Sequence, residues 1–390
     1  MEPLFPEKGD PAMSELVGEI TKLSGALYGR LPTQTRDAVA ETLRYTNCYY
    51  SNLIEGHATH PIDIDRAMKA DFSDEPSKKN LQLEARAHVE VQKAMECKLR
   101  AEPTLSPYSP EFLAWVHHAF YENLPIDFRT VRNPITGQSH EVEPGKFRRT
   151  EVQVGLHVAP AADSLTTFLR RFSSAYDAAE IPHYRRGIAL AASHHRLAWI
   201  HPFIDGNGRV IRLFSHAVAI RLGIDGCGLW TISRGLARTK DRYHELLQSA
   251  DSPRQGALDG RGNLSEKNLC KFCTYFFEQM LDQMQFMHGC IRPGQLEKQA
   301  AIYVRTHDLF GRHNEMAIRL LREAIAQGEF ARGDAALITG KGASTARDIL
   351  GRVMDSGLLT SPSVRGPVRL GLPIKSLDTL FPGLFPVMGL

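Results

Sequence analysis

The sequence lacks the features of a membrane or exported protein. No apolar run reaches the roughly 18 residues of a spanning helix, because His and Arg interrupt the most apolar stretches. The first residues carry acids and prolines instead of the basic start and apolar run of a signal peptide. We therefore expect a soluble protein of the cytoplasm with no membrane partner.

Cysteine is scarce, and neither sign of charge dominates. Six cysteines in 390 residues are too few for a disulfide scaffold, so reduced thiols are expected. The 47 basic and 44 acidic residues leave a formal net charge of +3, which excludes the chain-wide basic field of a nucleic-acid coat protein. With 43% hydrophobic residues the chain is typical of globular proteins, and its length suits two or three domains.

Apolar residues at helical spacing predict a mainly α fold. An N-terminal helical region, 1–104, contains a helix over 35–55 that ends at Gly56, where a left-handed cap is expected. A largely helical core follows over 105–290. Further helices are predicted over 77–100, around Trp115, and over 163–178, 185–200 and 208–223.

Two segments depart from helical spacing. Apolar and polar residues alternate over 152–158, which predicts a strand or hairpin and is the only convincing β pattern before residue 290. The run 291–295 is the best domain boundary. Within 297–390, two helices over 314–328 and 344–359 precede a hairpin over 361–372, the order of a winged-helix domain.

The most informative segment is HPFIDGNGRVIR, residues 201–212. Its Gly-Asn-Gly run leads directly into an apolar-periodic helix, so unpaired N–H groups at the helix N-terminus could bind phosphates. Arg209 and Arg212 lie three apart on one face of that helix and could hold a polyphosphate. Alone, each part is more often a simple turn or a solvated face.

Two further side chains complete a site for a metal–nucleotide complex. Asp205 offers a hard oxygen to Mg²⁺, which commonly binds one or two carboxylates plus substrate phosphates. His201 titrates near neutral pH and can act as a general base. No structural purpose requires a base, a carboxylate, a glycine loop and two arginines within twelve residues, so their combination indicates function.

The segment resembles the signature HPFx(D/E)GNGRxxR of the Fic family, with every specified position present. The resemblance extends over about residues 40–290. It implies a Fic-type helical core with a β-hairpin flap that transfers AMP from Mg-ATP to a Ser, Thr or Tyr hydroxyl of a target protein or of the chain itself. Pyrophosphate would be released, with ATP as co-substrate and Mg²⁺ as cofactor.

The resemblance also implies residue roles. His201 would deprotonate the target hydroxyl, Asp205 would hold Mg²⁺, and Phe203 would be the buried anchor of the loop. The expected nucleotide-binding residues are Gly206, Asn207 and Gly208 as anion hole, Arg209 and Arg212 for the outer phosphates, and Tyr243 beside the adenine. Many relatives have a second Tyr where this chain has His244. The expected flap residues, which would pair with an extended target segment, are Val154, Gly155, Leu156 and His157.

The run SNLIEG, residues 51–56, resembles the (S/T)xxxE(G/N) inhibitory motif of Fic proteins with an N-terminal inhibitory helix. By this resemblance Glu55 would pair with Arg212 and Ser51 would fix the helix, so the enzyme would be autoinhibited. In some relatives the same glutamate supports removal of AMP, which stays an alternative here. A second alternative is that Glu55 is only an exposed surface residue.

Other residues carry weaker signals. The histidine pairs 57/60, 117/118 and 194/195 are expected in packing or on the surface, and Cys270 and Cys273 in the core rather than on zinc. The cations of the C-terminal module that could contact DNA are Lys341, Arg347, Arg352, Arg365 and Arg369. A DNA-binding regulator with a nucleotide-sensing core is therefore the rival function, and DNA and a homodimer stay open as partners. The target and the signal that relieves inhibition are not encoded in any pattern we recognise.

Overall fold

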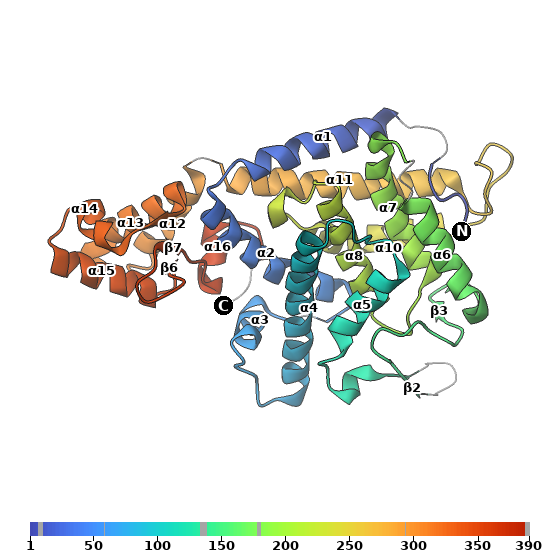
Figure 1. The fold of residues 1–390 in the computed structure, drawn as a ribbon, viewed down its shortest axis with the longest axis horizontal. Coiled ribbons are helices and arrows are strands. Elements are labelled where there is room, and N and C mark those ends of the chain that lie inside the picture. Colours follow the sequence, from blue (N-terminus) through green and yellow to red (C-terminus); the bar gives the residue numbers. More distant parts are fainter. Residues whose placement is uncertain (7–10, 58, 133–138, 178–180, 293, 387–390) are drawn as a thin grey trace. The chain divides into compact units, whose positions relative to one another are not determined.

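The computed structural model describes residues 1–6, 11–57, 59–132, 139–177, 181–292 and 294–386. These residues are mainly helical with a few short strands, as predicted (Figure 1). No described helix is long and apolar enough to cross a membrane. The chain divides into two compact units, which are described separately below.

The unit boundaries differ from the predicted ranges 1–104, 105–290 and 297–390. Unit 1 consists of Met1–Lys22, Asn47–Asp225 and Thr231–Gln283, and unit 2 of Leu23–Thr46, Gly226–Trp230 and Met284–Leu390. Three helices contribute residues to both units: α1 (Pro11–Tyr28), α2 (Thr33–Ile54) and α11 (Glu266–Cys290). The division therefore falls inside helices instead of in the run 291–295.

Helix α8 (Asn207–Arg221) forms the centre of unit 1. It is buried along most of its length and packs against α4, α5, α7 and α9 (Figure 1). A helix that is apolar on most faces is typical of such an enclosed position. The remaining helices of unit 1 are α3 (Pro61–Met68), α4 (Pro76–Ala101), α5 (Pro110–Tyr121), α6 (Leu165–Tyr176), α7 (His183–Ile200), α9 (Ile232–Arg238) and α10 (Lys240–Ala250).

The predicted helices 35–55, 77–100, 163–178, 185–200 and 208–223 correspond to α2, α4, α6, α7 and α8, and Trp115 lies on α5. The predicted end of α2 is confirmed. Gly56 has φ +87°, its N–H donates to Leu53 O at 3.1 Å, and the His57 N–H donates to Asn52 O at 2.9 Å. These bonds satisfy terminal carbonyls and turn the chain out of the helix immediately after Glu55.

The β structure of unit 1 consists of two small antiparallel pairs. The predicted segment 152–158 is a hairpin of two-residue strands, β3 (Gln153–Val154) and β4 (His157–Val158). A second pair, β1 (Thr130–Arg132) with β2 (Ser139–Glu141), carries no β pattern that the sequence analysis found. These three-residue strands are too short and too polar to show a period in the sequence.

Unit 2 joins helices to a three-stranded antiparallel sheet of order β5-β7-β6. Its strands are β5 (Glu329–Phe330), β6 (Leu359–Thr360) and β7 (Val368–Leu370), and its other helices are α12 (Gln295–Thr306), α13 (Asn314–Gln327), α14 (Ala335–Thr339), α15 (Ala343–Asp355) and α16 (Leu377–Leu380). The predicted helices 314–328 and 344–359 correspond to α13 and α15, although α15 ends at Asp355. Strands β6 and β7 form a hairpin, but only β7 lies within the predicted range 361–372, because β6 precedes it. The winged-helix assignment stays a prediction.

Two of the five cations suggested for DNA contact have partners within unit 2. The Arg369 guanidinium lies 2.8 Å from Glu329, and Arg352 lies over the ring of Phe310. Lys341, Arg347 and Arg365 are exposed.

Candidate active site

The predicted phosphate loop connects α7 to α8. At its start His201 has φ +49°, a left-handed conformation that turns the chain out of α7. At its end the amide of Asn207 closes the loop on Phe203, since Nδ2 donates to Phe203 O at 2.8 Å and Oδ1 accepts from Phe203 N at 3.0 Å. Phe203 is fully buried and stacks on His117 at 3.9 Å, which confirms it as the loop's anchor.

The glycines of the loop bring its backbone close to other groups. Gly206 caps α8 with φ +75°, and a Cβ there would clash with the ring of Tyr121 at 2.7 Å. A Cβ on Gly208 would collide with the Glu55 carboxylate. The first turn of α8 thus presents backbone N–H groups that favour an anion, and the Glu55 carboxylate lies directly over them.

A cavity of about 380 Å³ lies beside this helix terminus. Residues that line it include His201, Asn207, Gly208, Arg212, Tyr243 and the hairpin residues 154–157. The structure therefore brings the predicted base, anion hole, hairpin and second motif arginine to one cavity. Asp205 and Gly206 of the loop and Arg209 of α8 do not line the cavity.

His201 is half-buried, and its environment keeps the imidazole neutral. Burial, together with His157 and the Arg148 guanidinium, lowers the pKa of His201 to about 4. A neutral imidazole at physiological pH can accept a proton. The electrostatics of the site therefore suit the role of a general base.

Arg212 is enclosed by the end of α2. Its Nε donates to Ser51 Oγ at 2.9 Å, and its Nη2 donates to Ser51 O at 3.0 Å and Glu55 Oε1 at 2.7 Å. Burial raises the pKa of Glu55, but the Arg212 and Arg209 guanidinium groups outweigh it and hold that pKa below its ordinary value. Glu55 is therefore a charged partner of Arg212, and not an isolated surface residue.

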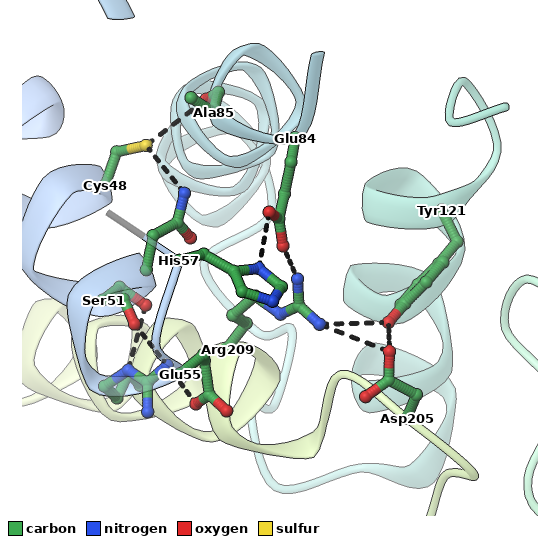
Figure 2. A network of polar contacts seen from close by, with 11 residues as sticks. Cys48, Ser51, Glu55, His57, Glu84, Ala85, Tyr121, Asp205 and Arg209 are labelled. Atoms are coloured by element: carbon green, nitrogen blue, oxygen red, sulfur yellow. Dashed lines mark hydrogen bonds and ion pairs between the residues drawn. The ribbon is translucent and has the colours of Figure 1, made fainter. Parts of the chain in front are cut away.

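Asp205 lies at the edge of a second polar cluster (Figure 2). Its Oδ2 accepts from Tyr121 OH at 2.7 Å and from Arg209 Nη2 at 3.4 Å. Within the described residues Oδ1 has no hydrogen bond, and the side chain is 41% exposed. One accessible carboxylate oxygen beside a phosphate cradle fits Mg²⁺, which takes its other ligands from phosphates and water. The described residues hold no cluster of three or more His, Cys, Asp or Glu that could bind a metal without such help.

Arg209 does not face the cavity in this structure. Its guanidinium is buried and pairs with Glu84 on α4 as well as with Asp205 and Tyr121. The spacing of Arg209 and Arg212 suggested that both project toward the phosphates. Their different neighbours could not be inferred from spacing alone, because Glu84 lies on another helix.

Tyr243 lines the cavity from α10 but is almost completely buried. Its hydroxyl lies 2.8 Å from His194 Nε2, and His194 Nδ1 lies 2.7 Å from Ser215 Oγ. Burial lowers the pKa of His194 well below its ordinary value, so this imidazole is neutral. His194 is thus a packing residue, as expected, that fixes the predicted adenine contact Tyr243.

The hairpin borders the cavity with exposed apolar side chains. Val154 and Leu156 are 49% and 81% exposed, whereas His157 turns inward and lies 2.8 Å from the carbonyl oxygen of Trp199. Gly155, at the turn, has φ +59°. An exposed edge with apolar side chains is suited to pairing with an extended peptide.

Arg148 was missed by sequence reasoning. Its buried guanidinium donates to four backbone carbonyls, those of Thr150 and Pro160 on either side of the hairpin and those of Ile200 and His201 at the end of α7. The bond from Nε to His201 O is 2.7 Å long. Arg148 therefore joins the backbone at His201, the predicted base, to the hairpin, and its place shortly before the hairpin is the only sequence signal of this role.

The other weak candidates are structural. His117 accepts from Gly145 N at 2.9 Å, His118 pairs with Glu122, and His195 is buried against Asp251. Cys273 is buried, as expected for a core cysteine. His57 differs, since its Nδ1 lies 2.8 Å from the buried carboxylate of Glu84.

Comparison with known proteins shows which family the region around this site resembles. The model of the Fic/DOC family matches residues 107–219. A protein adenylyltransferase Fic of Nematostella vectensis is 30% identical over 234 residues, which cover 59% of this chain and 48% of the relative. Another, from Culex quinquefasciatus, is 37% identical over 99 residues, covering 25% of this chain and 19% of the relative. The chain thus spans about half the length, or less, of these relatives.

Solved structures show the same fold. A Fic family protein from Desulfovibrio desulfuricans superposes with a TM-score of 0.55 at 18% identity, covering 94% of this chain and 98% of that one. A Fic domain-containing signaling protein from Bacteroides thetaiotaomicron gives a TM-score of 0.53 at 14% identity, covering 70% and 95%. Residues 107–219 of this chain are therefore similar to the Fic/DOC family, and the fold around them resembles that of solved Fic proteins.

Proposed function

We propose that this protein is an adenylyltransferase that moves AMP from Mg-ATP to a hydroxyl side chain of a protein. The observation that carries the proposal is the shared cavity of His201, the N-terminus of α8 and the exposed hairpin. One cavity thus offers a proton acceptor, an anion site and a peptide edge. The adenylyltransferases that are 30% and 37% identical over part of the chain support the same activity.

In the proposed reaction His201 takes the proton of the target hydroxyl as its oxygen attacks the α-phosphorus. The bond from the α-phosphorus to the bridging oxygen breaks, and pyrophosphate leaves. Gly206, Asn207 and Gly208 would hold phosphate oxygens through backbone N–H groups, while Arg212 would supply positive charge for the outer phosphates. Arg209, which pairs with Glu84 and Asp205 outside the cavity, makes no direct phosphate contact in this proposal. Bound Mg²⁺, held through Asp205, would neutralise phosphate charge.

We further propose that the described state is autoinhibited. Glu55 binds the Arg212 guanidinium, and its carboxylate fills the space over Gly208 where a phosphate would otherwise lie. A buried arginine of this kind strongly opposes loss of its partner, so a nucleotide phosphate must replace Glu55 when α2 moves. Tyr243 would contact the adenine beside this site.

The test is incubation with Mg²⁺ and α-labelled ATP, with detection of protein-bound label and of its mass. We expect the Glu55→Gly protein to gain label of the mass of AMP, several-fold or more above the wild type. The matched control is Glu102→Gly, which alters the C-cap of α4 and should leave labelling unchanged. His201→Ala combined with Glu55→Gly should abolish labelling, because a positioned base contributes about 10²–10⁴-fold.

Each result distinguishes the hypotheses. Label at another mass would indicate another donor. Absence of label from Glu55→Gly, together with a salt-dependent shift of DNA by the full chain, would favour the DNA-binding regulator with a sensing core. Release of AMP from a labelled protein by the wild type would favour the reverse reaction.

A further inference from the structure

Glu84 carries a carboxylate that the proposed reaction does not use. It lies on α4 and is completely buried, and each of its oxygens has a cationic or polar partner (Figure 2). Oε1 forms an ion pair with Arg209 Nη1, and Oε2 lies 2.8 Å from His57 Nδ1. With both oxygens engaged, the side chain is held in one orientation.

Arg209 links this carboxylate to the loop. Its Nη2 lies 3.3 Å from Tyr121 OH and 3.4 Å from Asp205 Oδ2, while its guanidinium stacks over the ring of Phe120. Tyr121 donates to the same oxygen of Asp205 at 2.7 Å. Arg209 and Tyr121 therefore converge on Oδ2, and the hydrogen-bonding capacity of Oδ1 is left toward the exposed side.

We propose that Glu84 is a positioning residue for the metal ligand Asp205 and acts through Arg209. The inference rests on the proposed function, in which Asp205 holds Mg²⁺. By neutralising Arg209, Glu84 prevents that guanidinium from binding Asp205 so strongly that it competes with the cation. By fixing Arg209, it also holds an otherwise exposed carboxylate in one orientation, as groups behind metal ligands commonly do.

The burial of the pair makes the arrangement a fixed part of the site and not a switch. Removing one partner from a buried ion pair leaves an unpaired charge, which strongly disfavours the separated state. Glu84 thus differs from Glu55, whose side chain is 32% exposed at the end of its helix. Loss of Glu84 is expected to weaken metal binding instead of activating the enzyme.

The test measures ATP binding by calorimetry, with excess Mg²⁺ and with EDTA, in the full-length Glu55→Gly/His201→Ala protein, which cannot turn over. The dissociation constant of ATP in EDTA divided by that in Mg²⁺ gives the contribution of the metal to binding. In the Glu84→Gln variant we expect this ratio to fall about tenfold or more, with the EDTA value unchanged within about twofold. Glu90→Gln is the matched control, because Glu90 lies on the same helix but pairs with Arg86 at the surface.

The outcomes separate this inference from the function on which it rests. If the parent protein binds ATP equally with Mg²⁺ and with EDTA, or not at all, the proposed metal–nucleotide site itself fails. If the parent depends on Mg²⁺ and Glu84→Gln retains its ratio, or loses affinity equally in both conditions, the positioning role of Glu84 is overturned. Should Glu84→Gln fail to fold, Glu84→Asp decides, since it keeps the charge but shortens the reach to Arg209. A ratio equal to that of the parent would then contradict the proposal.

Discussion

The loop 201–208 and the hairpin 153–158 border the same cavity, yet the loop buries Phe203 while the hairpin exposes Val154, Leu156 and Val158. The loop is closed by hydrogen bonds of Asn207 and by stacking of Phe203 on His117. The hairpin has strands of only two residues. Under the proposed function, the phosphate chemistry would require a rigid backbone, whereas a protein target would be bound by an edge that gains apolar cover only in the complex.

Replacing Arg148 tests this comparison most strongly, because Arg148 is hydrogen-bonded to both regions. Replacing it by Met leaves the carbonyls of Thr150, Pro160, Ile200 and His201 without their shared donor. We expect transfer in the Glu55→Gly background to fall about a hundredfold, the loss typical of a small displacement between reacting groups. The measurement is the labelling rate, with thermal unfolding recorded to show that the variant is folded. The adjacent, exposed Arg149→Met is the control, and equal rates in both variants would contradict the role of Arg148.

A change confined to the hairpin should affect the target and not the nucleotide. Leu156 is 81% exposed, so Leu156→Asp removes apolar contact from the proposed complex without disturbing the fold. We expect labelling of a protein acceptor to fall about tenfold, as for loss of one buried apolar side chain, while calorimetric ATP binding is unchanged. Leu258→Asp, at a leucine that is 96% exposed, provides the matched control. A parallel loss of ATP affinity would show that the hairpin is not a separate target surface.

The inhibitory contact can also be tested on α2 with a smaller change. Ser51→Ala removes the hydroxyl that accepts from Arg212 Nε but keeps the Ser51 carbonyl and Glu55 in place. Loss of one such hydrogen bond, about 1 kcal/mol, should raise wild-type labelling about fivefold. Ser174→Ala, at an exposed serine, is the control. If Ser51→Ala labels no faster than the wild type, Ser51 does not contribute to inhibition.

Local patterns made the helices and the motif predictable. The end of α2 at Gly56 and the end of α8 near Gly223 follow from apolar spacing and from glycines that adopt positive φ. Likewise, the glycines and the proposed base His201 are recognisable in the sequence because they lie within one short segment. The two-residue strands of the hairpin were also predictable as β structure from the alternation over 152–158, although their apolar side chains are exposed to solvent.

Contacts between distant segments were not predictable. Arg148 lies 53 residues from His201 and Ser51 lies 161 residues from Arg212, so a single sequence gives no indication of their pairing except by family resemblance. The membership of residues 23–46 in unit 2 was also not predictable, because it depends on contacts with residues far away in the sequence. Thr35 Oγ1 donates to Ala324 O at 3.1 Å within that unit, a bond made by folding and absent from any local pattern.

The smallest expected effect is that of pH on the transfer rate, which tests whether the loop keeps the His201 imidazole neutral. Burial, His157 and Arg148 lower the pKa of His201 to about 4, whereas Glu55 raises it, so the Glu55→Gly variant should have a pKa no higher than this. Above that pKa the imidazole is neutral and can act as the proposed base, and below it the imidazole is protonated and cannot. The transfer rate of Glu55→Gly should therefore change less than about twofold between pH 6 and pH 8 and fall only toward pH 4. Because the pKa of Glu55 is also held low, the ratio of variant to wild-type rates should be constant over the same range. A half-maximal rate near pH 6.5 would mean that His201 has the pKa of a solvated histidine and that the loop does not keep its base neutral.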